Sequence, residues 1–119
     1  MAKLSKAQQE VLDRAKYRID FARTHSFCDW WRKNESFWKY KEATDAEVYE
    51  ILEERTRKGW IGTLEWEMKH YEMERDGIDP YCHASSATIK KLETLGLIEI
   101  IYDSNGEYYG FDTIKILNY

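Results

Sequence analysis

Five polar side chains between residues 86 and 94 could contact a nucleic acid. They lie in the stretch SSATIKKLETLGLIEII, which reads as a short amphipathic helix, a glycine and a strand. Hydroxyl and ammonium groups on one helix face can meet phosphates and base edges in a major groove. The same pattern fits an ordinary solvated helix face, and the sequence leaves both interpretations open. The candidate DNA-contacting residues are Ser86, Thr88, Lys90, Lys91 and Thr94.

A second candidate is the stretch WWRKNESFWKYK, residues 30–41, in which aromatic rings alternate with cations. Bases stack on such rings, and the cations between them could hold a phosphate chain. Tryptophan is highly buried on average, so we favour rings that form core and cations that lie on the surface. In either case the cations could add contacts to the DNA backbone, through Arg32, Lys33, Lys39 and Lys41.

A third candidate is acidic. Glutamates recur along residues 45–75, and carboxylates repel duplex DNA but could bind a basic protein surface. A solubilising face is the more frequent use of such residues, and we favour it. The candidate protein-binding residues are Glu47, Glu50, Glu54, Glu65, Glu67 and Glu72.

The charge distribution supports no single partner. The net charge is −4. Residues 1–43 hold ten Lys/Arg and six Asp/Glu, residues 44–80 hold five and eleven, and residues 81–119 hold three and five. A basic first third therefore precedes an acidic middle, which matters more for binding than the net value.

Metal and catalytic chemistry find little support. His25 and Cys28, with Cys82 and His83, would give four zinc ligands, but adjacent ligands rarely both reach one tetrahedral ion. We expect both cysteines to be small buried apolar groups. The sequence has no glycine-rich phosphate loop, no nucleophile elbow and no HExxH motif. We therefore predict no enzyme, no metal and no cofactor.

Capping and periodicity define the elements that must position these residues. Ser5 with Gln8, and Thr44 with Glu47, have capping-box spacing. Helices are predicted over 6–23, 45–58 and 63–75, with short helical turns over 24–43 and a loop over 76–84. Over 63–69 the alternation of apolar residues with glutamates also fits a strand, and length and composition favour the helix. A helix capped by Ser85 or Ser86 follows and ends at Gly96. Strands are predicted over 98–102 and 107–117, joined by a turn at 103–106.

The fold class that follows is mostly α with a C-terminal β-hairpin, an α+β protein. We expect one domain over 1–119, with a helix and an aromatic segment over 1–43 and the main core over 44–119. No apolar run is long enough for a membrane span, and two unpaired cysteines favour a cytoplasmic protein. The predicted core is Val11, Leu12, Ile19, Val48, Ile51, Leu52, Leu64, Met68, Ile89, Leu92, Leu95, Leu97, Ile98, Ile100, Ile114 and Ile116.

Residues 85–116, SSATIKKLETLGLIEIIYDSNGEYYGFDTIKI, resemble the third helix and wing of a winged helix-turn-helix domain, as found in small proteins of phages and mobile elements. The resemblance implies double-stranded DNA binding by a small bacterial or phage transcriptional regulator, whose third helix enters the major groove. A homodimer formed through the N-terminal helix would bind two half-sites at once, so that their weak affinities combine. This sequence departs from the family in its long link over 76–84 and in a wing tip, 103–105, that has no basic residue.

Those departures favour an alternative from another class. The winged helix would then be a scaffold, and the acidic helices would occupy a basic surface on a host nucleic-acid enzyme, as phage-encoded anti-CRISPR inhibitors of defence nucleases do.

Overall fold

Side-chain caps begin three helices where the sequence predicts them. The Ser5 hydroxyl accepts from the backbone N–H of Gln8 at 3.2 Å, and the Gln8 side chain accepts from the Ser5 N–H at 2.9 Å. Thr44 and Glu47 form the same reciprocal pair. The Ser85 hydroxyl accepts from the N–H of Thr88. Each pair satisfies amides that a helix start leaves without intrahelical partners.

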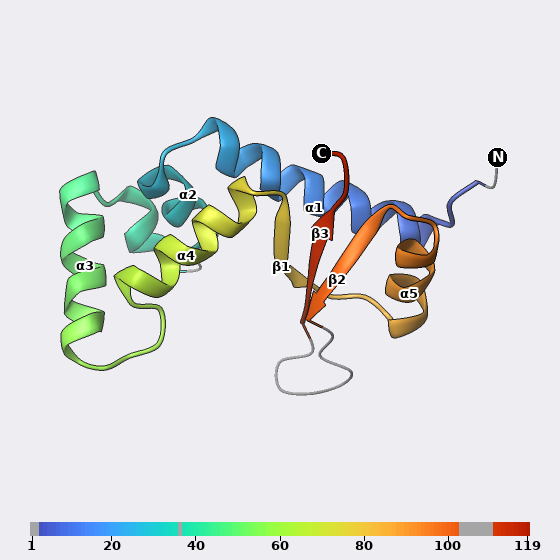
Figure 1. Cartoon of the computed structure of the whole chain (residues 1–119). Helices are drawn as coiled ribbons and strands as arrows, with labels where there is room; N and C mark the ends of the chain where they lie inside the picture. The colour runs from blue at the N-terminus through green and yellow to red at the C-terminus, as the bar shows by residue number, and fades with distance from the viewer. Residues whose placement is uncertain (1–2, 36, 103–110) are drawn as a thin grey trace. The chain divides into compact units, whose positions relative to one another are not determined.

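The computed structural model describes residues 3–35, 37–102 and 111–119. The order of elements is α1 (Lys6–Thr24), α2 (Phe27–Asn34), the 3-10 helix η1 (Trp38–Glu42), α3 (Asp45–Arg57), α4 (Leu64–Arg75), β1 (Ile78–Cys82), α5 (Ser86–Thr94), β2 (Ile98–Tyr102) and β3 (Asp112–Ile116) (Figure 1). The predicted α+β class is confirmed. None of the described helices combines the length and apolar character that crossing a bilayer requires.

The chain divides into two compact units. Unit 1 contains Met1–Asp20 and Met73–Tyr119, and unit 2 contains Phe21–Glu72. The predicted division between residues 43 and 44 falls inside unit 2.

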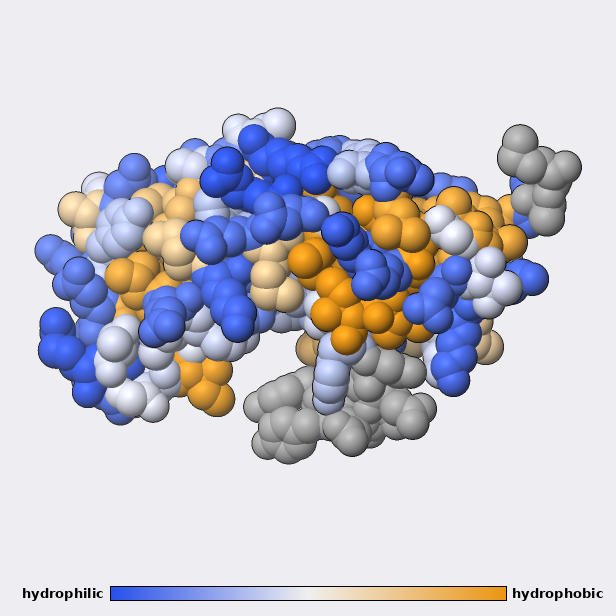
Figure 2. All heavy atoms as spheres, viewed as in Figure 1, coloured by the Kyte–Doolittle hydropathy of each residue, from blue (hydrophilic) through white to orange (hydrophobic). Residues whose placement is uncertain are grey.

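Unit 1 is built on an antiparallel sheet with the strand order β1-β3-β2. In register, Ile114 of β3 lies between Asp79 of β1 and Ile100 of β2. In the view of Figure 2 an apolar area lies over the strands, and Ile101 and Tyr102 of β2 are about half exposed. The core of unit 1 contains Val11, Leu12, Ala15, Ile19, Cys82, Ile89, Leu92, Ile98, Ile114 and Ile116, with Leu4, Ala84, Leu97 and Ile100 packed against it.

The predicted loop at 76–84 is wrong, because β1 occupies most of it. Pro80 has no N–H to give to a sheet, and proline is tolerated only on edge strands and at bulges. β1 meets both conditions: it is an edge strand, and its register with β3 shifts between Asp79 and Cys82. Asp79 also accepts a hydrogen bond from the N–H of Tyr81 at 2.9 Å. The same Asp-Pro pair therefore suits a bulged edge strand as well as a loop.

Unit 2 is helical and aromatic. The predicted short helical turns over 24–43 are confirmed as α2 and η1. Trp30 and Trp31 are buried, whereas Phe37 and Trp38 are exposed, so the expectation that the rings form core holds for the first pair only. The core of unit 2 contains Ala22, Phe27, Cys28, Trp30, Trp31, Val48, Leu52 and Tyr71, with Phe21, Tyr40, Ala43, Ile51, Leu64 and Met68 packed against it.

Leu95 is the one residue of the predicted core that is exposed, at 40%. It is the C-cap of α5. Gly96 follows with φ +75°, which turns the chain so that the N–H of Leu97 reaches the carbonyl of Leu92 at 3.1 Å. This left-handed ending returns Leu97 to the core and leaves Leu95 on the outside. The predicted strand over 107–117 is described from Asp112 onwards, and the predicted turn at 103–106 lies outside the described residues.

Candidate nucleic-acid interface

One side of α5 is fixed in the core of unit 1, and this determines which side is open. Ile89 and Leu92 are buried, at 2% and 0% exposure. Residues at helical spacing from these two share the buried face, so the residues between them point outwards. Ser86, Lys90, Lys91 and Thr94 are exposed and Thr88 is half-buried. We call these five residues the α5 face.

Two hydroxyls of the α5 face already have hydrogen-bond partners within the helix. The Thr88 hydroxyl lies 2.8 Å from that of Ser85, so it belongs to the helix cap. The Thr94 hydroxyl donates to the carbonyl of Lys90 at 2.9 Å. Both hydroxyls are therefore satisfied locally and would have to exchange partners to contact a ligand. Lys90 and Lys91 carry the charge of this face.

Neither Lys90 nor Lys91 forms an ion pair with a described residue. The acid of the same helix, Glu93, accepts a hydrogen bond from the N–H of Ile100 at 3.1 Å. That bond holds its carboxylate beside β2. The two ammonium groups are thus available to an anionic ligand.

The predicted backbone-contacting cations all lie in unit 2, and α5 lies in unit 1. Arg32 is committed to structure: it pairs with Asp29 at 2.5 Å and Asp45 at 2.8 Å, and donates to the carbonyl of Ala43 at 2.9 Å. The hydrogen bond that Arg32 donates to Asp29 is the main cause of its raised pKa. This arginine therefore joins α2 to the start of α3, a role that its sequence neighbourhood does not indicate.

The three lysines of that set remain at the surface. Lys41 donates to the carbonyl of Lys33 at 3.4 Å, which brings these two residues together. The ammonium of Lys33 lies 5.0 Å from the ring centroid of Phe21, and that of Lys39 lies 5.7 Å from the ring centroid of Trp38. All three lysines are exposed.

The predicted acidic face divides into engaged and open carboxylates. Glu47 belongs to the α3 cap, where hydrogen bonds from Thr44 lower its pKa. Glu54 pairs with Arg57 and with Lys58. Glu50, Glu65 and Glu72 are exposed and form no ion pair with a described residue. Half of this set is therefore open to a partner.

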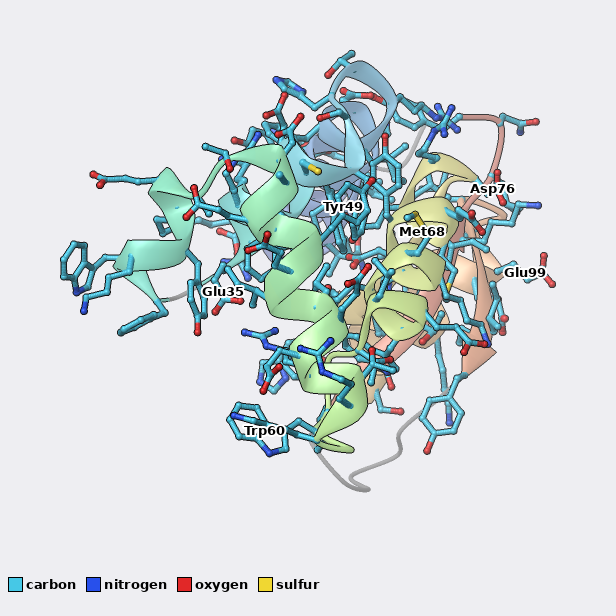
Figure 3. All side chains as sticks on the ribbon, turned by 90° about the vertical axis from the view of Figure 1, so that its left-hand side faces the viewer. Glu35, Tyr49, Trp60, Met68, Asp76 and Glu99 are labelled. Atoms are coloured by element: carbon cyan, nitrogen blue, oxygen red, sulfur yellow. The ribbon has the colours of Figure 1, made fainter. Side chains whose placement is uncertain are left out.

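Glu67 belongs to a charged cluster around Arg55 that the sequence did not indicate. Arg55 pairs with Glu35 at 3.3 Å, and both side chains are more than four-fifths buried. The guanidinium also lies 5.5 Å from the ring centroid of Trp31 and 5.6 Å from that of Tyr40. Figure 3 labels Glu35 beside α3 and shows the neighbouring α4.

Arg55 and Glu67 both lie next to Gly62. Its φ is +79°, and a Cβ at this position would lie 3.3 Å from Arg55 Nη1 and 3.4 Å from Glu67 Oε1. A side chain at this position would crowd both groups. Burial raises the pKa of Glu67 to about 7; Arg55 lowers this pKa and Glu35 raises it.

This arrangement predicts a pH-dependent stability. Since the folded pKa of Glu67, about 7, lies above its usual 4.5, the folded state keeps a proton that the unfolded state loses between these values. The contribution of Glu67 to stability should be full below pH 4.5 and should fall as the pH rises to about 7. Allowing for the solvent-exposed part of the carboxyl, we expect a loss of about 2 kcal/mol.

Urea unfolding at pH 5 and pH 8 measures this change. Glu67→Gln should remove most of the difference, whereas Glu65→Gln, an exposed neighbour, should leave it intact. A wild-type protein equally stable at both pH values, or a Glu67→Gln variant with the same difference as the wild type, would contradict the assignment.

Each cysteine lies in the core of its own unit. Cys28 and Cys82 are free and buried, as predicted, and they belong to different units. Burial raises the pKa of the Cys82 thiol to about 12, and burial likewise raises the pKa of Cys28. The His25 ring stacks on Phe21 at 3.8 Å. Within the described ranges no group of three or more His, Cys, Asp or Glu side chains is placed to hold a metal ion.

Comparison with known proteins gives no match: no family model fits the chain, and no curated protein or solved structure is significantly similar to it.

Proposed function

We propose that the protein binds double-stranded DNA through the α5 face, as a small winged-helix regulator of bacterial or phage origin. The observation that carries the proposal is the state of Lys90 and Lys91, which are exposed and form no ion pair with a described residue. Each lysine that meets a phosphate releases counterions from the duplex, and this release supplies most non-specific affinity.

The order of α5, β2 and β3 supports the winged-helix part of the proposal. In such domains a recognition helix precedes an antiparallel ribbon, and here β2 pairs antiparallel with β3 directly after α5. The departure is β1, which stands directly before α5 where a helix-turn-helix has another helix. Phosphate contacts that such a helix would make must therefore come from other parts of the chain.

The proposal predicts a loss of duplex affinity when both lysines are removed. The double variant Lys90→Ala/Lys91→Ala should bind a random 20-base-pair duplex about 10- to 30-fold more weakly at low salt. It should also reduce the slope of log affinity against log salt by about 1.8, because two phosphate contacts are lost. Fluorescence anisotropy of a labelled duplex, titrated at several salt concentrations, measures both quantities.

Lys115→Ala is the matched control, since this exposed lysine of unit 1 lies on β3 rather than on α5. It should leave both the affinity and the salt slope close to those of the wild type. A wild-type protein that binds no duplex at low salt, or a control that loses as much affinity as the double variant, would overturn the proposal.

Dimerisation through α1 stays a prediction. The apolar stripe of this helix is used within the chain: Val11, Leu12, Ala15 and Ile19 are buried in unit 1. The exposed large apolar side chain of α1 is Tyr17, at 59%. Sedimentation equilibrium of the wild type and of Tyr17→Ala tests whether this helix joins two copies.

A second candidate function, binding to a basic protein surface, is favoured by the open carboxylates Glu50, Glu65 and Glu72. Exposed apolar side chains lie in the same unit, among them Trp60 and Ile61 at 58% and 82%. Figure 3 shows Trp60 projecting away from the ribbon at the end of α3. Such a surface would fit the nucleic-acid groove of a host nuclease.

Inhibition of DNA cleavage by a purified defence nuclease tests this second function. If the acidic face binds the enzyme, Glu50→Lys/Glu65→Lys should relieve inhibition and Lys90→Ala/Lys91→Ala should not. Inhibition that depends on the lysines instead would point to competition for the DNA itself.

A further inference from the structure

Two neighbouring aromatic rings of unit 2 are left in solvent. Phe37 is 45% exposed and Trp38 is 64% exposed, and their ring centroids lie 6.4 Å apart. The rings of Phe37 and Tyr40 also make an edge-on contact, with their centroids 5.0 Å apart. Large aromatic rings bury well in a core, so rings exposed at the surface are available to stack on a ligand.

Two lysines follow Trp38 on the same short helix. The ammonium of Lys39 lies 5.7 Å from the ring centroid of Trp38, and Lys41 is exposed on the same short helix. We call Phe37, Trp38, Lys39 and Lys41 the η1 surface. Aromatic rings on which bases can stack, beside cations that can hold phosphates, are the groups with which proteins bind single strands.

The acids near the η1 surface are mostly taken up by arginines. Four carboxylates lie between residues 27 and 45. Asp29 and Asp45 pair with Arg32, and Glu35 pairs with Arg55. Glu42 is exposed and forms no ion pair with a described residue. Lys39 and Lys41 are exposed and form no ion pair with a described residue, so two lysines stand against one open carboxylate and the local charge is positive.

Trp60 is also an exposed tryptophan beside a lysine, but the charge of that lysine is neutralised. It is 58% exposed, and the ammonium of Lys58 lies 4.8 Å from its ring centroid. Lys58, however, pairs with Glu54 at 3.4 Å, and Arg57 pairs with the same carboxylate. Trp60 therefore has a neighbouring cation that is already neutralised, and it serves as a matched control for Trp38.

We propose that the η1 surface binds single-stranded nucleic acid, with the rings of Phe37 and Trp38 stacking on bases and Lys39 and Lys41 holding phosphates. Unpaired bases expose the faces that stacking needs, whereas a duplex hides them. The η1 surface uses other residues than the α5 face, and its proposed binding does not depend on duplex binding by α5.

Fluorescence anisotropy with a labelled 15-nucleotide oligo-dT tests the proposal on the full chain. Trp38→Ala should weaken binding about tenfold, since stacking of one base is lost. Trp38→Phe should recover much of that loss, because it keeps a ring, and Trp60→Ala should bind like the wild type. Lys39→Ala/Lys41→Ala should lower the salt slope by about 1.4, as expected for two contacts to a single strand.

Three results would overturn this site. The first is a wild-type protein that does not bind oligo-dT at low salt. The second is a Trp60→Ala variant that loses as much affinity as Trp38→Ala. The third is an oligo-dT affinity that falls with Lys90→Ala/Lys91→Ala and not with Trp38→Ala. Duplex binding is measured with different variants, so either site can fail without the other.

Discussion

Replacing Arg55 with alanine is expected to lower the free energy of unfolding by about 3–4 kcal/mol. The substitution leaves Glu35 and the half-buried Glu67 without their shared cation. Removing one partner of a buried ion pair is costly because the remaining charge is left in a poorly solvated place. The rings of Trp31 and Tyr40 also lose the guanidinium that lies over them.

Arg57→Ala is the control for this substitution. Arg57 lies two residues further along α3 and also pairs with a glutamate, Glu54, but its side chain is 66% exposed. An exposed pair contributes little, so this variant should lose less than about 1 kcal/mol.

Tryptophan fluorescence during urea unfolding is the suitable measurement, since all five tryptophans of the chain lie in unit 2. Equal losses for Arg55→Ala and Arg57→Ala would show that the cluster around Arg55 is not a buried anchor of this unit.

Replacing Leu92 with alanine is expected to lower the free energy of unfolding by about 3–4 kcal/mol as well. Leu92 is fully buried, and its deletion leaves a cavity that close-packed neighbours fill only in part. The loss falls on unit 1, where Leu92 fixes α5 on the core beneath β2. Duplex binding should weaken together with stability, because the α5 face depends on this anchor.

Leu95→Ala on the same helix is the matched control. Leu95 is 40% exposed, so its truncation should lower the free energy of unfolding by less than about 1 kcal/mol. Far-UV circular dichroism during urea unfolding follows both variants. A larger loss for Leu95→Ala than for Leu92→Ala would reverse the assignment of the inner and outer sides of α5.

The local signals of the sequence predicted the helices well because each depends on nearby residues. The caps at Ser5, Thr44 and Ser85 and the stop at Gly96 act within one or two turns, so their spacing could be read directly. The strand over 98–102 is confirmed at both ends. The α5 face followed from the periodicity of Ile89 and Leu92, and its exposure agrees with that prediction.

The features that the sequence did not predict depend on partners far along the chain. β1 exists because β3, more than thirty residues later, pairs with it, and nothing within 76–84 announces that pairing. Arg55 meets Glu35 across twenty residues, and Arg32 meets Asp45 across thirteen. Periodicity shows which residues share a helix face, but it cannot show which charges of two elements will meet. The commitment of Arg32 to structure was therefore not foreseen.

Composition alone could not predict that Phe37 and Trp38 are exposed. Trp30 and Trp31 lie on one buried face of α2, whereas the other two rings follow the end of that helix and begin η1. Aromatic residues on one face of a helix are buried together. Residues of the next element have another orientation and need not share that burial. The boundary at residues 34–38 thus separates rings that form core from rings that could bind.

Mapping the backbone amide NMR shifts of the labelled protein during titration with a random duplex tests the central claim most directly. If the α5 face binds DNA, the largest shifts should fall on residues 85–94, and the amides of α3 should change little. The shifts on residues 85–94 should be much smaller in Lys90→Ala/Lys91→Ala at the same duplex concentration. Largest shifts on α3 and α4, or no shifts at low salt, would contradict duplex binding by α5.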